Sequence, residues 1–134
     1  ELAPFIPAGS LTPTSKMGML ETNKSLPIAA VTDGASQCLM YTERAGLPTE
    51  YVTAGPIGTF TRGAAWADDE GNFSLHGYSR DGRTQGGDCA INCNNRHEIF
   101  AFHTGGANAV FGDGSVRFLK DTIPVGVVAA MITR

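Results

Sequence analysis

His103, Asp113 and Gly114 are the residues whose types and spacing first suggest chemistry, with nine residues between the histidine and the Asp-Gly pair. A histidine and an aspartate can act as general base and orienting group in acyl transfer, but that chemistry also needs a nucleophile. No Gly-x-Ser-x-Gly sequence marks one, and the nucleophiles that remain to be considered are Ser36, Ser115 and Cys38. We therefore prefer a structural role, in which Asp113 and Gly114 form a turn and His103 hydrogen-bonds backbone or a carboxylate.

Cys89, Cys93 and His97 follow one another at intervals of four, which is an inventory suited to zinc. A fourth ligand would come from His103 or His76. A helix would align the three, but the asparagines between them disfavour one. We prefer a disulfide between Cys89 and Cys93, which favours an oxidising compartment. Cys38, in an apolar run, is expected to be a buried free thiol.

Calcium is a weaker candidate ligand, because carboxylates gather in one loop, "WADDEGN". Its oxygen donors would be Asp68, Asp69, Glu70 and Asn72. The Asp-x-Asp-x-Asp-Gly spacing is absent, so a solvated acidic turn is the preferred interpretation. An exposed aromatic patch for sugars is a further alternative to core packing, and it would consist of Trp66, Tyr41, Tyr51, Tyr78 and Arg62.

Composition limits the function classes. The 134 residues are 42% hydrophobic and 17% charged, as in folded chains, and the net charge is −3 without a basic cluster. Nucleic acid is therefore not expected as a partner. The longest nearly unbroken apolar run, 125–132, is far shorter than the roughly 20 residues that cross a bilayer.

The elements that must position these residues are short. With 17 Gly and 7 Pro, the chain is expected to be an α+β, β-rich domain with an antiparallel sheet, many loops and one or two short helices. We expect one domain over 1–134, with an irregular segment at 1–27 that holds a short helix at 16–21, and a sheet-rich core at 28–134. Asp33 and Gly34 mark a turn before a strand at 37–43. Further strands are expected within 49–55, 58–68 and 72–78, with a turn at 55–58.

Residues 98–119 predict a three-stranded meander. The strands are expected within 98–103, 107–111 and 115–119, and Asp113-Gly114 between apolar runs is a strong hairpin signal. Asp121 or Thr122 is expected to cap a short helix with Pro124 at an early position. Its core-facing residues would be Val125, Val128, Met131 and Ile132.

Several blocks in order resemble a large bacterial family with pilin-type leader peptides, abundant in planctomycetes and of unknown function. The blocks are "VTDGASQCLMYTERAG", "GAAWAD", "GGDCAINCNN" and "HEIFAFHTGG", followed by the His-x(9)-Asp-Gly signature of His103, Asp113 and Gly114. Gln37 and Cys38 depart from the family's usual Asn-Thr. The chain resembles the globular ectodomain alone, so the resemblance implies a pilin-like fold and a membrane link only through an N-terminal helix that is absent here.

The resemblance also implies a location outside the cytoplasm, at the cell surface, in the periplasm or secreted. We expect a non-enzymatic structural or pseudopilin-like assembly subunit without a cofactor, whose partners are copies of itself or other protein subunits. The 80–96 loop and the N-terminal segment would contact neighbours. The alternative is a binding module for a carbohydrate or another small ligand, and a hydrolase ranks third.

Overall fold

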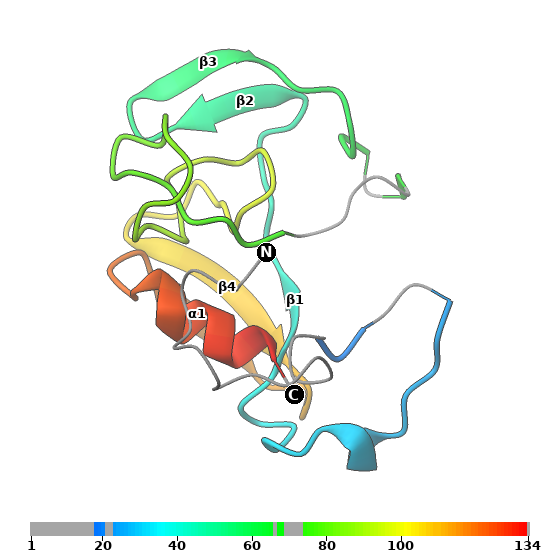
Figure 1. Cartoon of the computed structure of the whole chain (residues 1–134). Helices are drawn as coiled ribbons and strands as arrows, with labels where there is room; N and C mark the ends of the chain where they lie inside the picture. Colours follow the sequence, from blue (N-terminus) through cyan, green and yellow to red (C-terminus); the bar gives the residue numbers. More distant parts are fainter. Residues whose placement is uncertain (1–17, 21–22, 66, 69–73, 134) are drawn as a thin grey trace.

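The computed structural model describes residues 18–20, 23–65, 67–68 and 74–133. Its elements are a 3₁₀ turn η3 (Ile28–Ala30), strands β1 (Leu39–Thr42), β2 (Thr49–Val52), β3 (Gly55–Thr59), β4 (Gly106–Phe111) and β5 (Val116–Lys120), and helix α1 (Val125–Ile132). The strands form two antiparallel sheets, one ordered β1-β4-β5 and one formed by β2 and β3. Figure 1 shows the β2–β3 hairpin at one end, α1 and the larger sheet at the other, and loops of the 74–105 region between them. The expected β-rich α+β fold is confirmed.

A bulge in β1 places Leu39 on the buried face of the larger sheet and Tyr41 on its open face. Leu39 pairs with Phe111 and Tyr41 pairs with Val110, so the register shifts at Met40. Without that extra residue, Leu39 and Tyr41 would point to the same side of the strand. With it, Leu39 is buried and Tyr41 is exposed.

Helix α1 covers the buried face (Figure 1). Val125, Val128 and Ala129 are its buried residues, and Met131 and Ile132 pack against the same core as half-buried side chains. The core residues that they meet on the sheet are Leu39, Ala107, Ala109, Phe111 and Leu119. The predicted core face of the helix is confirmed, but the predicted cap is wrong. Pro124 is the N-cap, and no side chain caps the helix.

The predicted hairpin of β4 and β5 is confirmed, whereas the expected third strand at 98–103 is not part of its sheet. β1 takes that place beside β4. Phe100 instead forms a parallel bridge with Arg44, and Ile99 forms one with Ile91. The physical reason is a side-chain contact. Asn92 accepts the Ala101 N–H at 2.8 Å and donates to the Gly106 carbonyl at 3.0 Å, so it occupies backbone groups that strand pairing would use.

The smaller sheet also differs from expectation in one respect. Residues 55–58, expected as a turn, belong to strand β3, and the turn of this hairpin falls at 53–54. Glycines and a proline are tolerated there because β3 is an edge strand of a two-stranded ribbon. The expected strand at 72–78 is absent from its described part, 74–78, where only Tyr78 forms bridges, to Gln85 and Cys89.

The expected strand at 37–43 corresponds to β1, and the expected irregular course is observed at 23–27. The helix expected at 16–21 lies mostly outside the described residues, and residues 18–20 are not helical. In the described part of the chain, no helix has the length and apolar character to span a bilayer.

Candidate functional site

His103 and Asp113 contact different partners. The His103 side chain is half exposed, and its Nε2 lies 3.4 Å from Glu43 Oε1. Asp113 Oδ1 instead accepts hydrogen bonds from the backbone N–H and the hydroxyl of Ser115, at 2.9 and 2.6 Å. These bonds and a φ of 81° at Gly114 define the β4–β5 turn, as expected for an Asp-Gly hairpin. No described hydrogen bond connects His103 with Ser36, Ser115 or Cys38.

The Glu43 side chain contacts both His103 and Asn108. Its carboxylate accepts the Asn108 N–H at 2.6 Å and contacts the Asn108 side-chain amide and His103, both at 3.4 Å. Burial alone would raise the pKa of Glu43, but the hydrogen bonds from Asn108 and His103 hold it below its usual range. The carboxylate joins the end of β1 to β4, so the expected structural role of His103, bonded to a carboxylate, agrees with the geometry.

The turn at Asp33 and Gly34 precedes the buried Cys38. Gly34 donates to the Val31 carbonyl at 3.2 Å, and Gln37 donates to the Gly34 carbonyl at 2.9 Å. The Cys38 thiol is buried and donates to the Thr133 carbonyl at 3.1 Å. Burial raises the pKa of this thiol, and the Asp33 carboxylate raises it further. Cys38 is thus a protonated core thiol that contacts the end of α1, not an activated nucleophile.

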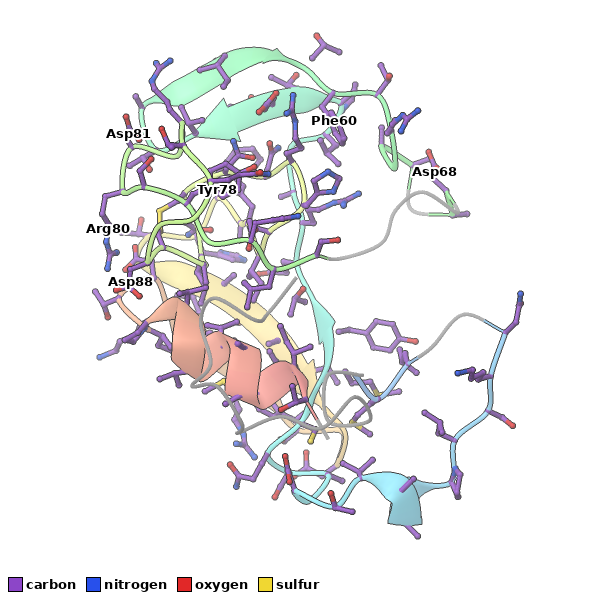
Figure 2. All side chains as sticks on the ribbon, in the orientation of Figure 1. Phe60, Asp68, Tyr78, Arg80, Asp81 and Asp88 are labelled. Atoms are coloured by element: carbon purple, nitrogen blue, oxygen red, sulfur yellow. A yellow bond between two sulfur atoms is a disulfide. The ribbon has the colours of Figure 1, made fainter. Side chains whose placement is uncertain are left out.

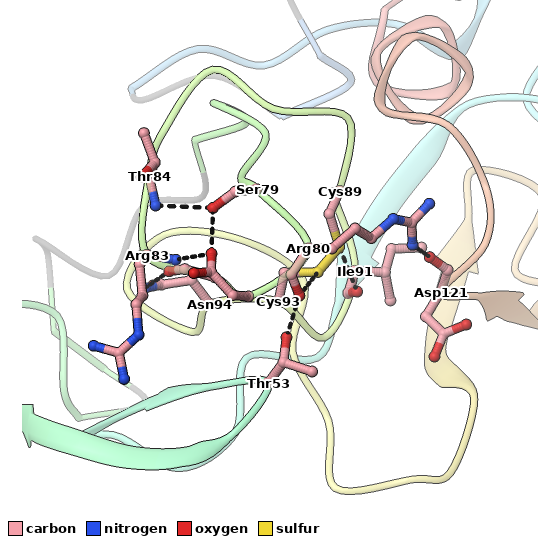
Figure 3. Close-up of a disulfide and its surroundings, with 12 residues drawn as sticks. Thr53, Ser79, Arg80, Arg83, Thr84, Cys89, Ile91, Cys93, Asn94 and Asp121 are labelled. Atoms are coloured by element: carbon pink, nitrogen blue, oxygen red, sulfur yellow. Dashed lines mark hydrogen bonds between the residues drawn. A yellow bond between two sulfur atoms is a disulfide. The ribbon is translucent and has the colours of Figure 1, made fainter.

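Cys89 and Cys93 form the expected disulfide, with Cα atoms 6.2 Å apart (Figure 3). Both residues are buried with Tyr78. With their sulfur atoms bonded to each other, neither cysteine can serve as the thiolate that the zinc hypothesis required. Among the described residues, no group of three or more His, Cys, Asp or Glu side chains is arranged to hold a metal ion.

The calcium and aromatic hypotheses gain no support. Asp69, Glu70 and Asn72 lie outside the described residues, and Figure 2 places Asp68 on an outlying segment, away from both sheets. Trp66 is also outside them. The remaining aromatic residues of the expected patch are separated, since Tyr78 is buried whereas Tyr41 and Tyr51 belong to different sheets. Tyr51 instead contacts Phe102 edge to face, with ring centroids 5.1 Å apart.

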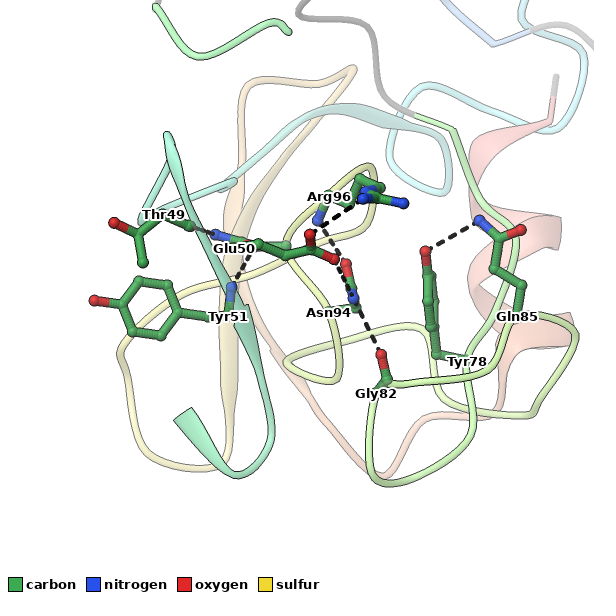
Figure 4. A network of polar contacts seen from close by, with 9 residues as sticks. Thr49, Glu50, Tyr51, Tyr78, Gly82, Gln85, Asn94 and Arg96 are labelled. Carbon is green, nitrogen blue, oxygen red and sulfur yellow. Dashed lines mark hydrogen bonds and ion pairs between the residues drawn. The ribbon is translucent and has the colours of Figure 1, made fainter. Parts of the chain in front are cut away.

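A polar cleft that the sequence did not predict lies between the β2–β3 hairpin and the loop at 78–85. Its volume is about 440 Å³. Its lining includes Glu50 and Ile57 from the hairpin, Tyr78 and residues 82–85 from the loop, and Asn94 and Arg96 from the next segment. Three segments distant in the sequence therefore form one concave surface (Figure 4).

The floor of the cleft is a hydrogen-bonded chain. Asn94 donates to the Gly82 carbonyl at 3.0 Å and to Glu50 at 3.3 Å, and Arg96 forms an ion pair with the other oxygen of Glu50 at 3.2 Å (Figure 4). Asn94 is almost fully buried, and its own Oδ1 accepts the Arg96 N–H at 2.7 Å. The guanidinium of Arg96 also lies over the Phe60 ring, 4.9 Å from its centroid. The carboxylate and guanidinium of the floor are thus fixed from two sides.

The disulfide supports the loop wall of this cleft. Gly82 packs against the Cys93 carbonyl, and the turn before it is held by the Asp81 carboxylate, which accepts from Ser79 Oγ at 2.5 Å and from the Arg83 N–H at 3.1 Å (Figure 3). Hydrogen bonds from Ser79 and Arg83 lower the pKa of Asp81, so this turn keeps its charged acceptor.

Three titratable residues lie close together: Glu98, which is buried, and His76 and His97, which are partly buried. Glu98 is 1% exposed, and its Oε1 accepts the His76 N–H at 2.6 Å and lies 3.3 Å from His76 Nδ1. Burial raises the pKa of Glu98 to about 7. The pKa of His97 is lowered, mainly by burial and secondly by the charge of His76. The centroids of these two rings lie 5.7 Å apart. Glu98 Oε2 and His97 Nδ1 are buried without a hydrogen-bond partner.

The signal that could have indicated the cleft is the run "NCNNRHE", 92–98, whose asparagines were considered only as residues that disfavour a helix and form a loop. Each of the three asparagines in this run forms hydrogen bonds with backbone groups that are distant in the sequence. Asn95, for example, accepts the Tyr51 N–H at 2.8 Å and donates to the Ala45 and Thr49 carbonyls, both at 2.9 Å.

Comparison with protein-family models gives a match over residues 7–126, to a family described as a protein of unknown function, DUF1559. The matched range includes His103, Asp113, the disulfide and the whole cleft. Neither the curated proteins nor the solved structures contain a match to the chain.

Proposed function

Because this chain belongs to DUF1559, a family of proteins of unknown function, its role is inferred from its surfaces, and we propose that it is a non-enzymatic assembly subunit outside the cytoplasm. In this proposal, copies of the chain associate through the open face of the β1-β4-β5 sheet. The observation that carries it is an exposed apolar strip on that face.

The apolar strip consists of Tyr41, Val110, Val116 and Phe118. Tyr41 is paired with Val110, and Val110 is paired with Val116, so these side chains form a row on one side of the sheet. Phe118 lies two residues from Val116 along β5 and shares its face. Tyr41, Val116 and Phe118 are 58%, 65% and 48% exposed, and α1 covers the opposite face.

An apolar row on a sheet face that no described helix or strand covers favours packing against a second apolar surface. A second copy provides that surface by itself, because a two-fold pair brings the same strip against its equivalent. The half-exposed His103 and Glu43 join the rim of this face through Asn108, which is opposite Phe118. This polar rim around an apolar centre is the usual arrangement of protein interfaces.

Two observations support the remaining parts of the proposal. The Cys89–Cys93 disulfide favours an oxidising location outside the cytoplasm. The bonds that occupy His103 and Asp113 favour a structural use of the two residues that most suggested catalysis.

The test is the mass in solution as a function of concentration, measured by light scattering or sedimentation. We expect the wild-type chain to form dimers and Val116→Lys to remain monomeric, since a charge in the centre of the strip must be desolvated on association. Val127→Lys is the matched control, because Val127 is a 46% exposed residue on α1, away from the strip. A monomeric wild type at every concentration contradicts self-association. Equal effects of the two variants contradict this face as the interface.

A further inference from the structure

The polar cleft has the dimensions of a small-molecule site. Its volume of about 440 Å³ falls within the range of about 300–1,000 Å³ that is typical of ligand pockets. Its floor is preorganised by the bonds among Glu50, Asn94, Arg96 and Gly82. A site whose polar groups are already held in place loses little conformational freedom when a ligand binds.

The charges of the lining favour an anion. The lining contains one carboxylate, Glu50, and two guanidiniums, Arg83 and Arg96. The ion pair with Arg96 compensates Glu50. The exposed Arg83 side chain makes no hydrogen bond in the described part of the chain, and the nearby Asp81 carboxylate is already bonded to Ser79 and to the Arg83 backbone. Within the lining itself, one positive charge therefore exceeds the negative charge. Asp81, which is not part of the lining, offsets a share of it through its charge interaction with Arg83.

The remaining polar groups suit hydroxyl groups. The Tyr78 hydroxyl accepts the Gln85 side-chain amide at 3.0 Å, so its own proton is available for donation toward the cleft (Figure 4). Burial raises the pKa of Tyr78, which keeps that proton in place. The Gln85 carbonyl oxygen and the Thr84 hydroxyl lie in the same lining and make no hydrogen bond to another described residue. Ile57, 45% exposed, adds an apolar contact.

We propose that this cleft binds a small carboxylate that carries neighbouring hydroxyl groups, a ligand of the uronic acid class. Arg83, with Arg96 beside it, binds the carboxylate, while Tyr78, Thr84 and Gln85 exchange hydrogen bonds with the hydroxyl groups. This binding activity is separate from the proposed assembly role, because the cleft and the apolar strip are on different sheets.

The experiment is an NMR or calorimetric titration of the oxidised wild-type chain with glucuronate, with glucose and acetate as comparison ligands. We expect glucuronate to bind more tightly than either and to weaken as salt is added. Arg83→Gln should weaken glucuronate binding by about tenfold, since a hydrogen bond to a charged group contributes more than a neutral one. Lys120→Gln, which removes an exposed charge from β5, should leave binding unchanged.

Tyr78→Phe retains the buried ring and removes the hydroxyl, so it should weaken glucuronate binding without changing acetate binding. Absence of glucuronate binding overturns the proposal. Equal affinity for glucose and glucuronate overturns the role of the arginines, and equal affinity for acetate overturns the role of the hydroxyl-binding groups. A loss of affinity in Arg83→Gln that Lys120→Gln reproduces overturns the assignment of the ligand to this cleft.

Discussion

The buried carboxyl group of Glu98 contacts His76 through both the backbone N–H and the ring Nδ1 of that residue. The His76 N–H donates to Glu98 Oε1 at 2.6 Å, while Glu98 Oε2 is buried without a partner. Burial outweighs the hydrogen bonds from His76 and Gly77, so the pKa of Glu98 is raised from 4.5 to about 7. The protonated form is therefore the one that the fold favours near and below neutral pH.

The first prediction concerns the pH dependence of stability. A raised acid pKa gives stability that is fully present below the unfolded pKa of 4.5 and is lost as the pH rises through about 7. The loss amounts to roughly 3 kcal/mol at most, from the size of the shift. Glu98→Gln retains a neutral side chain at every pH, so its free energy of unfolding should decline less between pH 4.5 and 8 than that of the wild type.

Denaturant unfolding of both chains at matched pH measures this difference. Burial lowers the pKa of His97, so this residue has the opposite effect: it reduces the stability of the fold as the pH falls below 6.5. Because His97 is present in both chains, its contribution largely cancels when their free energies of unfolding are compared. Parallel curves for the two chains would contradict a buried carboxyl at Glu98.

The second prediction concerns Asn92, whose side chain forms hydrogen bonds with the backbone of residues 101–106. Asn92 has a φ of 59°, accepts the Ala101 N–H, and donates to the His103 and Gly106 carbonyls. Asn92→Ala loses these three bonds and must adopt a left-handed conformation, so we expect a loss of about 2–4 kcal/mol. Asn92→Gly loses the same bonds without the backbone strain and should be less destabilised by about 1 kcal/mol.

Thermal or denaturant unfolding checks both variants of Asn92. If alanine and glycine are equivalent, the positive φ carries no cost. If both are within experimental error of the wild type, the side chain does not hold this segment.

The third prediction compares two glycines with similar backbones. Gly82 and Gly86 have φ values of 77° and 90°, so alanine is strained at either position. A Cβ at Gly82 would collide with the Cys93 carbonyl, whereas a Cβ at Gly86 meets nothing within 4 Å. Gly86→Ala should cost about 1–2 kcal/mol, and Gly82→Ala clearly more. Unfolding measurements separate them, and equal losses would contradict the contact between Gly82 and Cys93.

The fourth prediction concerns the disulfide. The ring closed by Cys89 and Cys93 is short, so the loop-entropy relation gives a stabilisation of only about 2 kcal/mol. The replacement of both cysteines by serine should therefore leave a folded chain. Because Cys93 supports Gly82 at the cleft wall, we expect faster amide hydrogen exchange at residues 79–85 in this variant. Cys38→Ser is the control, since Cys38 contacts Thr133 and not this loop, and exchange that is unchanged in the double variant would contradict the supporting role.

The sequence pattern correctly predicted the β4–β5 hairpin, the core face of α1 and the Cys89–Cys93 disulfide. The β4–β5 hairpin depends on Asp113 and Gly114, and the apolar spacing of Val125 and Val128 fixes the core face of α1. The disulfide also followed from a short loop between two cysteines. Each of these features is decided by residues that are close together in the chain.

The rest depends on contacts between distant residues. The segment at 98–103 has strand composition, but Asn92 binds its backbone at Ala101 and at His103, and β1 takes the place beside β4. The bulge at Met40 leaves no pattern that distinguishes it from a regular strand. The cleft joins Glu50, Tyr78 and Asn94, whose separation in the sequence follows no spacing rule.

The apolar strip on β1, β4 and β5 also sets the stoichiometry of the proposed assembly. A contact between two identical strips around a two-fold axis uses the strip of both copies, so this association closes at two chains. Addition of a strand to the free edge of β5 would avoid that limit, but charged Arg117 and Lys120 on this short strand disfavour edge pairing. A filament would therefore require a second, different surface on each chain, and with the strip alone the assembly is a finite symmetric pair.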